Sequence, residues 1–191
     1  NNDGKIDNND LTSYTNYTGL RKGDSDYEGY ISVGDIDQNG LIDAYDISVV
    51  ATQLEDGVSE EPIEKLDGTI EISTAKRNYS KGDVVEVLVK GVNLRSVNAL
   101  SFALPYNQQD YEFVGVEPLN LKAMENLTYD RLHTNGTKAL YTTFVNLGAK
   151  EALEGTNDLF ILKLKAKRAV KFDLKAIDGV LVDKNLNTRK F

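Results

Sequence analysis

The stretch Asp35-Ile36-Asp37-Gln38-Asn39-Gly40-Leu41-Ile42-Asp43-Ala44-Tyr45-Asp46 spaces oxygen-bearing side chains in a fixed pattern. Positions 1, 3, 5, 9 and 12 of this run are Asp35, Asp37, Asn39, Asp43 and Asp46. Gly40 stands at position 6, where the backbone must turn sharply, and Leu41 at position 7 would offer its main-chain carbonyl. Loops with this spacing bind Ca²⁺ through about 6 to 8 oxygen ligands. The run therefore predicts a calcium loop, with Asp in place of the usual Glu at position 12.

The first ten residues fit the same template with its first two positions absent. Positions 3, 5, 7, 9 and 12 are then Asn1, Asp3, Lys5 (through its carbonyl), Asp7 and Asp10. Apolar residues at helical spacing follow each loop and predict helices at Leu11–Gly19 and Ile47–Leu54. Because the chain begins partway through a motif, we expect it to be the C-terminal part of a longer protein.

Residues 24–35 fit the template as well. Positions 1, 3, 5, 7 and 12 would be Asp24, Asp26, Glu28, Tyr30 (carbonyl) and Asp35. Asp35 would then close one loop and open the next, which is feasible because the two oxygens of a carboxylate can bridge two cations. An acidic turn without metal explains Asp24, Asp26 and Glu28 equally well. The sequence therefore predicts two calcium sites and leaves a third open.

The charge distribution supports this interpretation and excludes several classes of function. Residues 1–61 hold 14 acidic and 3 basic side chains, whereas residues 62–191 hold 16 acidic and 19 basic ones. Bound Ca²⁺ would offset the clustered carboxylates, and so acidic a segment is unsuited to nucleic acid. Cysteine is absent, which excludes disulfides and thiolate sites. No run of about 18 apolar residues predicts a membrane span, and no signal peptide is found.

The tandem of calcium loop and single helix in residues 1–57 resembles the dockerin module, an EF-hand-like repeat without the leading helix. The resemblance rests on the loops 1–10 and 35–46 and on the helices after them. Dockerins are expected to read a protein partner at loop positions 10 and 11, which here are Asn8 and Asn9 in one loop and Ala44 and Tyr45 in the other. The unequal pairs depart from the symmetric pattern of the family, so they leave the partner's identity open.

The chain after residue 57 changes character. Acidic residues with Gly57 and Pro62 and no periodicity predict a linker at residues 58–68. From residue 69 to 191, short alternating runs dominate, and Asn135-Gly136 stands between two of them as a strong hairpin signal. This pattern predicts an all-β antiparallel sandwich. The fold class is therefore multidomain, with a small α calcium-loop domain at 1–57 and a sandwich at 69–191.

The sandwich resembles the cohesin family, a jelly-roll fold. The resemblance rests on Tyr79-Ser-Lys-Gly-Asp-Val-Val-Glu-Val-Leu-Val89, on Leu100-Ser-Phe-Ala-Leu-Pro-Tyr-Asn107 and on the strand that starts at Tyr111. Asn107 stands where the family usually has Asp. Such modules are expected to dock proteins, and related sandwiches bind polysaccharide.

No catalytic constellation emerges, and the single histidine, His133, excludes a multi-histidine metal site. Lys163, Lys165 and Lys167 alternate with apolar residues and, with Lys171 and Lys175, would line the outer face of two paired strands. Such a stripe is either a solvated face or a docking surface for the acidic segment, in the same chain or in another molecule. Tyr106, Tyr111, Tyr129 and Tyr141 could contribute to a flat sugar-binding face, but tyrosines on strands more often pack half-buried, and packing is the favoured interpretation.

These observations lead to one functional expectation with two alternatives. We expect a non-catalytic, calcium-dependent protein-interaction tail of the cohesin–dockerin kind, with self-association as one form of docking. The resemblance implies a bacterial, extracellular, cell-surface or periplasmic setting and a parent glycoside hydrolase that degrades polysaccharide. The alternatives are a carbohydrate-binding module and a structural spacer of the same enzyme.

Overall fold

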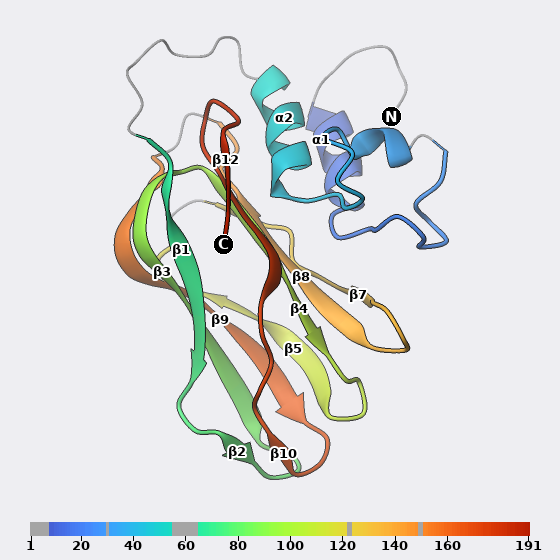
Figure 1. Cartoon of the computed structure of the whole chain (residues 1–191), viewed down its shortest axis with the longest axis vertical. Helices are drawn as coiled ribbons and strands as arrows, with labels where there is room; N and C mark the ends of the chain where they lie inside the picture. Colours follow the sequence, from blue (N-terminus) through green and yellow to red (C-terminus); the bar gives the residue numbers. More distant parts are fainter. Residues whose placement is uncertain (1–7, 30, 55–64, 122–123, 149–150) are drawn as a thin grey trace.

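The computed structural model describes residues 8–29, 31–54, 65–121, 124–148 and 151–191. The described chain begins with helix α1 (Asn8–Thr15), the short 3-10 helix η1 (Ser32–Gly34) and helix α2 (Ala44–Leu54). Strands then follow to the C-terminus (Figure 1). They are β1 (Asp67–Thr74), β2 (Asn78–Tyr79), β3 (Val84–Val97), β4 (Ala99–Tyr106), β5 (Tyr111–Pro118), β6 (Glu125–Asn126), β7 (Tyr129–Leu132), β8 (Lys138–Val145), β9 (Leu153–Ala166), β10 (Val170–Lys171), β11 (Ile177–Val182) and β12 (Thr188–Lys190).

The strands form two large sheets. One has four strands in the order β1-β3-β9-β5, and the other has six, with β12-β11-β4-β8-β6 in a row and β7 also paired to β8. A small pair, β2 with β10, closes one end of the molecule. Every strand pair between the described residues is antiparallel. The predicted two-sheet antiparallel sandwich is therefore confirmed.

The two sheets enclose an apolar core built by alternation along the strands. Leu100, Phe102 and Leu104 of β4 point inward and are fully buried. The ring centroids of Phe144 on β8 and Phe160 on β9 lie 4.6 Å apart and join the two layers. Burial of this apolar surface is the main stabilising contribution to the sandwich.

The outer face of the six-stranded sheet is buried as well, because residues 8–54 cover it (Figure 1). Helix α2 contacts β4, β8 and β11. The shared apolar cluster, which we call the docking cluster, combines residues of the segment and of the sheet: Leu11, Leu20, Ile42, Ala44, Ile47 and Ala51 with Ala99, Val145, Val180 and Val182. The molecule is thus a sandwich with a loop–helix segment as a third layer.

The prediction of a separate α domain is not supported. Helices α1 and α2 have 8 and 11 residues, and isolated helices of that length are marginal in water. Their apolar side chains are buried against the sheet and not within an independent core. Helix α2 also begins earlier than predicted, at Ala44 instead of Ile47, because it starts inside the loop that precedes it. Helix α1 ends at Thr15, earlier than the predicted Gly19.

Local predictions for the strands were right in one case and wrong in another. The hairpin at Asn135-Gly136 is confirmed, since β7 pairs with β8 and both turn residues have positive φ. The run that carries Lys171 and Lys175 was predicted to pair with the strand that carries Lys163, Lys165 and Lys167. This is wrong, because both edges of β9 are occupied by β3 and β5, and β10 pairs with β2 instead. No helix in the described residues is long and apolar enough to span a membrane.

The close approach of the segment to the sheet can be tested at Gly19. Its φ is +83°, and a Cβ there would lie 2.5 Å from the Cβ of Tyr141 on β8. Gly23 has a similar φ of +103° but open space around it. We expect Gly23→Ala to cost about 1–2 kcal/mol for its backbone conformation alone, and Gly19→Ala to cost more because it also displaces the segment. Urea unfolding of both variants measures the difference, and equal losses would contradict the contact.

Candidate metal centre

Two carboxylates at the start of α2 hold its first turn. The Oδ1 atom of Asp43 accepts the N–H of Tyr45 at 2.7 Å, and the Oδ2 atom of Asp46 accepts the N–H of Asp43 at 2.9 Å. This is the reciprocal capping arrangement of N-cap and third helical residue, with Asp at the third position instead of Glu or Gln. Loop positions 9 and 12 therefore also determine where α2 begins.

The loop before α2 is folded around its own carboxylates. Asp35 accepts the N–H groups of Asn39 at 3.0 Å and Gly40 at 2.9 Å, and Gly40 has the positive φ that its position requires. Asp46 accepts the N–H of Ile36 at 2.7 Å through its other oxygen. The hydroxyl of Tyr27 also donates to Asp35.

These contacts bring three predicted ligands together. Asp35, Asp37 and Asp46 each offer an oxygen, and these atoms all lie within 4.8 Å of one another. In the described part of the chain this is the one such group of acidic, His or Cys side chains. The Nδ2 atom of Asn39 lies 3.1 Å from Asp37 and 3.3 Å from Asp43, so the five predicted side-chain ligands of the loop adjoin. Leu41, the predicted carbonyl ligand, forms a bridge with Arg21.

Burial makes the negative charge of this group costly. Burial raises the pKa of Asp46 to about 7, although the hydrogen bond from the N–H of Asp43 partly opposes the shift. Burial likewise raises the pKa of Asp43 to about 6, against the hydrogen bond from Tyr45. A divalent cation between the carboxylates would offset this cost. The residues present fit a hard cation that prefers oxygen ligands.

Among the other predicted ligands, the side chains of Asp24, Asp26 and Glu28 are described, and they are not part of this group. Asn1, Asp3, Lys5 and Asp7 lie outside the described residues, as do Tyr30 and the side chain of Asp10. Asp24 accepts the N–H of Arg21 at 2.8 Å, and Asp26 accepts the hydroxyl of Ser25 at 3.3 Å. These contacts, and Glu28 beside them, suit an acidic turn. The first loop and the third site stay predictions.

The loop residues predicted to bind a partner differ in their exposure. The side chain of Ala44 is fully buried, and its N–H donates to Oγ of Ser101 on β4 at 3.2 Å. Tyr45 is half-buried and packs against the docking cluster. Asn9 is exposed on α1, where the side chain of Asn8 is not described. Ala44 and Tyr45 therefore contact or adjoin the sheet of their own chain.

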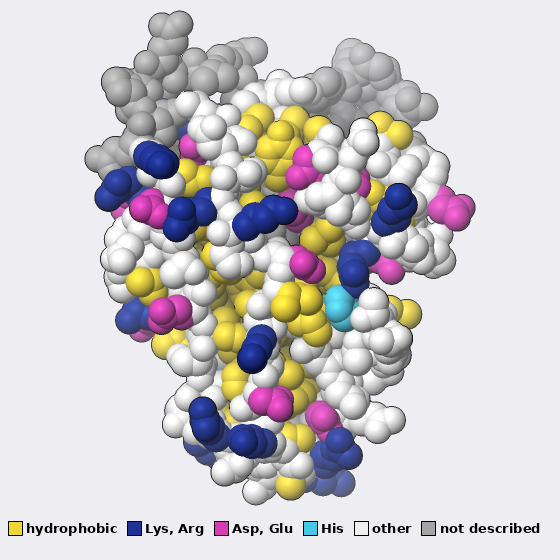
Figure 2. All heavy atoms as spheres, viewed as in Figure 1, with side chains coloured by type: hydrophobic (Ala, Val, Ile, Leu, Met, Phe, Trp, Pro, Cys, Tyr) yellow, Lys and Arg dark blue, Asp and Glu magenta, His cyan; other side chains and the backbone are white. Residues whose placement is uncertain are grey.

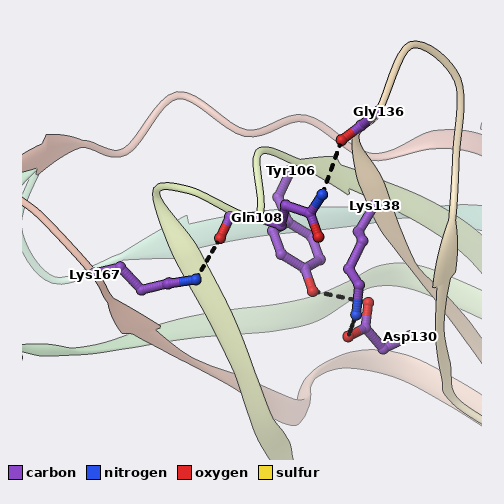
Figure 3. Close-up of polar contacts among 6 residues, drawn as sticks. All are labelled: Tyr106, Gln108, Asp130, Gly136, Lys138 and Lys167. Carbon is purple, nitrogen blue, oxygen red and sulfur yellow. Dashed lines mark hydrogen bonds and ion pairs between the residues drawn. The ribbon is translucent and has the colours of Figure 1, made fainter.

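The predicted lysine stripe lies elsewhere. Lys163 and Lys165 are on β9 in the four-stranded sheet, whereas the segment covers the six-stranded one. Lys163 pairs with Glu117, and Lys167 donates to the carbonyl of Gln108 at 2.8 Å (Figure 3). The described part of the acidic segment therefore does not face this stripe, because the two lie on opposite layers. Docking to another molecule stays a prediction.

The four strand tyrosines follow the packing alternative and do not form a flat sugar-binding face. Tyr106, Tyr111 and Tyr141 are almost fully buried, and Tyr129 lies under the guanidinium of Arg131 at 4.6 Å. The hydroxyl of Tyr106 donates to Asp130 at 2.8 Å (Figure 3). These rings pack within the protein, so they offer no exposed platform for a sugar.

Polar contacts that the sequence did not predict fasten the segment to the sheet. Arg131 on β7 donates to the carbonyl oxygens of Thr18 at 2.8 Å and Asn16 at 2.5 Å. Arg21 contacts His133, which follows β7, with Nη1 and Nδ1 2.7 Å apart. These partners are more than 100 residues apart in sequence. The sequence did contain one signal that another layer covers β4. Ala99, Ser101 and Ala103 are small residues, and they leave room for that layer on the outer face of the strand.

Comparisons with known proteins place the sandwich near one group of structures. No family model and no curated protein sequence matches the chain. A non-cellulosomal cohesin from Archaeoglobus fulgidus is 18% identical over 63% of this chain and 81% of that chain, with a TM-score of 0.47. A cohesin module from a Clostridium perfringens family 33 glycoside hydrolase is 14% identical over 66% and 90%, with a TM-score of 0.49.

A type I cohesin–dockerin complex from Clostridium thermocellum is 16% identical over 63% of this chain and 90% of that chain, with a TM-score of 0.46. All three TM-scores lie below 0.5, so the antiparallel sandwich is assigned from its own strand pairing. The chain is similar in fold to these modules.

The buried carboxylates predict an unusual pH dependence in metal-free buffer. In the unfolded chain Asp46 loses its proton near pH 3.8, whereas in the folded chain it keeps the proton to about pH 7. The folded state then binds more protons between these values, so the contribution of Asp46 to stability falls as pH rises from about 4 to 7. The slope is at most about 1.4 kcal/mol per pH unit.

The comparison of wild type with Asp46→Asn isolates this contribution, because all other titrating groups are common to both proteins. With a chelator present, the free energy of unfolding of the wild type in urea should fall relative to that of the variant as pH rises from about 4 to 7. Saturating Ca²⁺ should remove the fall, because the metal binds the deprotonated form. A difference that is independent of pH would contradict the raised pKa.

Proposed function

We propose that this chain is a non-catalytic, calcium-dependent protein-interaction tail whose metal loop holds α2 against the outer face of the six-stranded sheet. One observation carries the proposal: the run Asp43-Ala44-Tyr45-Asp46 belongs both to the metal loop and to the interface between α2 and the sheet. Asp46 belongs to the carboxylate group, Asp43 lies beside it, and both residues cap α2. Ala44, between them, is buried against Ser101 of β4.

The physical sequence of events follows from this arrangement. Without a cation, the group of Asp35, Asp37 and Asp46 concentrates negative charge at a largely buried place. Asp35, Asp37 and Asp46 would hold Ca²⁺, which would offset that charge, and Asp43 and Asp46 of the ordered loop cap the first turn of α2. An ordered α2 then presents Ala44, Ile47 and Ala51 to the sheet as one apolar face. Metal binding and docking are thus thermodynamically linked.

The partner of the loop–helix segment is, in this proposal, the sandwich of the same chain. Loop positions 10 and 11, where the dockerin resemblance puts partner recognition, are Ala44 and Tyr45, and these are the residues that face the sheet or its rim. Self-association is therefore proposed in its intramolecular form.

The wider setting is proposed on the resemblance stated for the sequence. The tail belongs to a bacterial, extracellular or cell-surface carbohydrate-active enzyme and contributes no catalytic residue of its own. The carbohydrate-binding alternative is less favoured, because the candidate tyrosines are occupied in internal packing.

Calcium titration tests the proposal directly. We expect isothermal titration calorimetry to show Ca²⁺ binding that Asp37→Asn weakens about tenfold or more, since affinity follows the number of charged ligands. Asp37 is exposed, so its substitution leaves the apolar packing intact. At a Ca²⁺ concentration 100 times Kd, the segment should be stabilised by about 2.7 kcal/mol.

Hydrogen exchange at constant pH gives the structural readout. Chelation should increase exchange in α2 and in β4 and β8, while the four-stranded sheet stays protected. Glu71→Gln, an exposed substitution on β1, is the matched control and should bind Ca²⁺ as wild type does. Protection of β4 and β8 that is indifferent to chelation would disprove the link between metal and docking.

A further inference from the structure

The single histidine of the chain lies where the segment meets the sheet. His133 follows β7, and its Nδ1 atom lies 2.7 Å from Nη1 of Arg21 and 3.0 Å from the hydroxyl oxygen of Tyr141. Arg21 belongs to the segment, whereas His133 and Tyr141 belong to the sandwich. In Figure 2 the histidine lies at the surface of the view, beside a basic side chain. The contact therefore spans the docking interface.

The chemistry of the contact fixes the protonation state of the ring. A guanidinium has N–H donors and no acceptor, so Nδ1 of His133 must accept the hydrogen bond. The ring is then neutral and carries its proton on Nε2. Protonation of Nδ1 would set a donor against a donor and a second positive charge 2.7 Å from Arg21. The docked arrangement is therefore incompatible with a charged His133.

We propose that His133 and Arg21 form a pH-sensitive latch that keeps the loop–helix segment on the sheet at neutral pH and releases it in acid. The proposal rests on the docking given under the proposed function and not on its metal. Docking of the segment would then depend on pH as well as on Ca²⁺, and acidification would uncover the outer face of β4, β8 and β11.

The hairpin that carries His133 is held in place by polar contacts outside the interface, which fix the backbone on which the ring is mounted. Asp130 on β7 accepts the Tyr106 hydroxyl and the Lys138 ammonium, each at 2.8 Å, and Gln108 donates to the carbonyl of Gly136 at 3.3 Å (Figure 3). The N–H of His133 itself donates to the carbonyl of Thr137 at 2.9 Å. A new charge on the ring therefore acts on the segment.

The charged groups around His133 oppose one another. Arg21 and burial lower its pKa, whereas Asp178 on β11 and Asp24 on the segment raise it. Burial is the largest cause, and the pKa lies below the ordinary 6.5. On the same hairpin Arg131 is a further cation, and on β8 Tyr141 stays neutral because burial raises its pKa.

The sign of the pH effect follows from these shifts. The released form of His133 takes up its proton near pH 6.5, while the docked form takes it up only at lower pH. Between the two values the released form binds more protons, so docking is complete above pH 6.5 and weakens as pH falls. One linked proton limits the change to about tenfold per pH unit.

Because the chain has no cysteine, a single introduced thiol can report release. Ser101→Cys is nearly isosteric and lies under Ala44 at the interface, and Ser73→Cys on the exposed part of β1 is the matched reference. The ratio of their labelling rates by a disulfide dye cancels the intrinsic pH dependence of thiols. It is measured in the full chain with saturating Ca²⁺ from pH 7.5 to 4.5.

We expect this ratio to rise by up to tenfold per pH unit below pH 6.5 and then to level off. In the His133→Gln background, which keeps an acceptor but cannot titrate, the ratio should stay flat. An equal rise in both backgrounds would overturn the latch, since the carboxylates of the metal loop are common to both. In Arg21→Gln the pKa of His133, followed by NMR, should increase, and an unchanged value would also overturn it.

The same reporter separates this proposal from the proposed function. At pH 7.5, chelation should raise the labelling of Ser101→Cys if Ca²⁺ holds the segment on the sheet. If chelation leaves the ratio unchanged, the metal link is disproved. If acid raises the ratio only when His133 is present, the latch is supported. The opposite pattern would support the metal link and disprove the latch.

Discussion

The fully buried carboxylate of Asp46 is the constraint on which the loop–helix segment depends. Its two oxygens accept backbone N–H groups from Ile36 and Asp43, which ties the start of the loop to the start of α2. Asp35 and Asp37 lie close to it, because they flank Ile36, whose N–H donates to Asp46. Charge is concentrated where water is largely excluded, and one carboxylate sets both the geometry of the loop and the start of α2.

The outer face of the six-stranded sheet has small side chains where the segment packs against it. Ala99, Ala103 and Ala139 are small enough for Leu41 and α2 to lie directly on the strands, and Gly19 lets the backbone pass against Tyr141. A sheet covered on both faces needs apolar residues on both, and β4 and β8 are buried nearly throughout. The segment and the sheet therefore complete one another, although their polar fastening is confined to a few side chains such as Arg131 and Arg21.

Much of the local structure could be predicted because it depends on short-range sequence patterns. The spacing of Asp35 to Asp46 predicted which carboxylates would gather, and the hairpin at Asn135-Gly136 followed from the two residues that accept positive φ. Alternation along β4 and β9 predicted the inward-facing core. Each of these signals depends on neighbours a few residues apart, where backbone geometry alone decides which side chains meet.

What the sequence by itself determined was therefore the loop, the strands and the sandwich class. Tertiary structure alone decided that the segment lies on the six-stranded sheet, that the lysines of β9 face away from it, and that His133 meets Arg21. Those contacts join residues more than 100 positions apart, and no local pattern encodes which partner they find. The physical reason is that short helices cannot bury their apolar faces alone. Their position is therefore determined by the surface of the folded sandwich against which they pack.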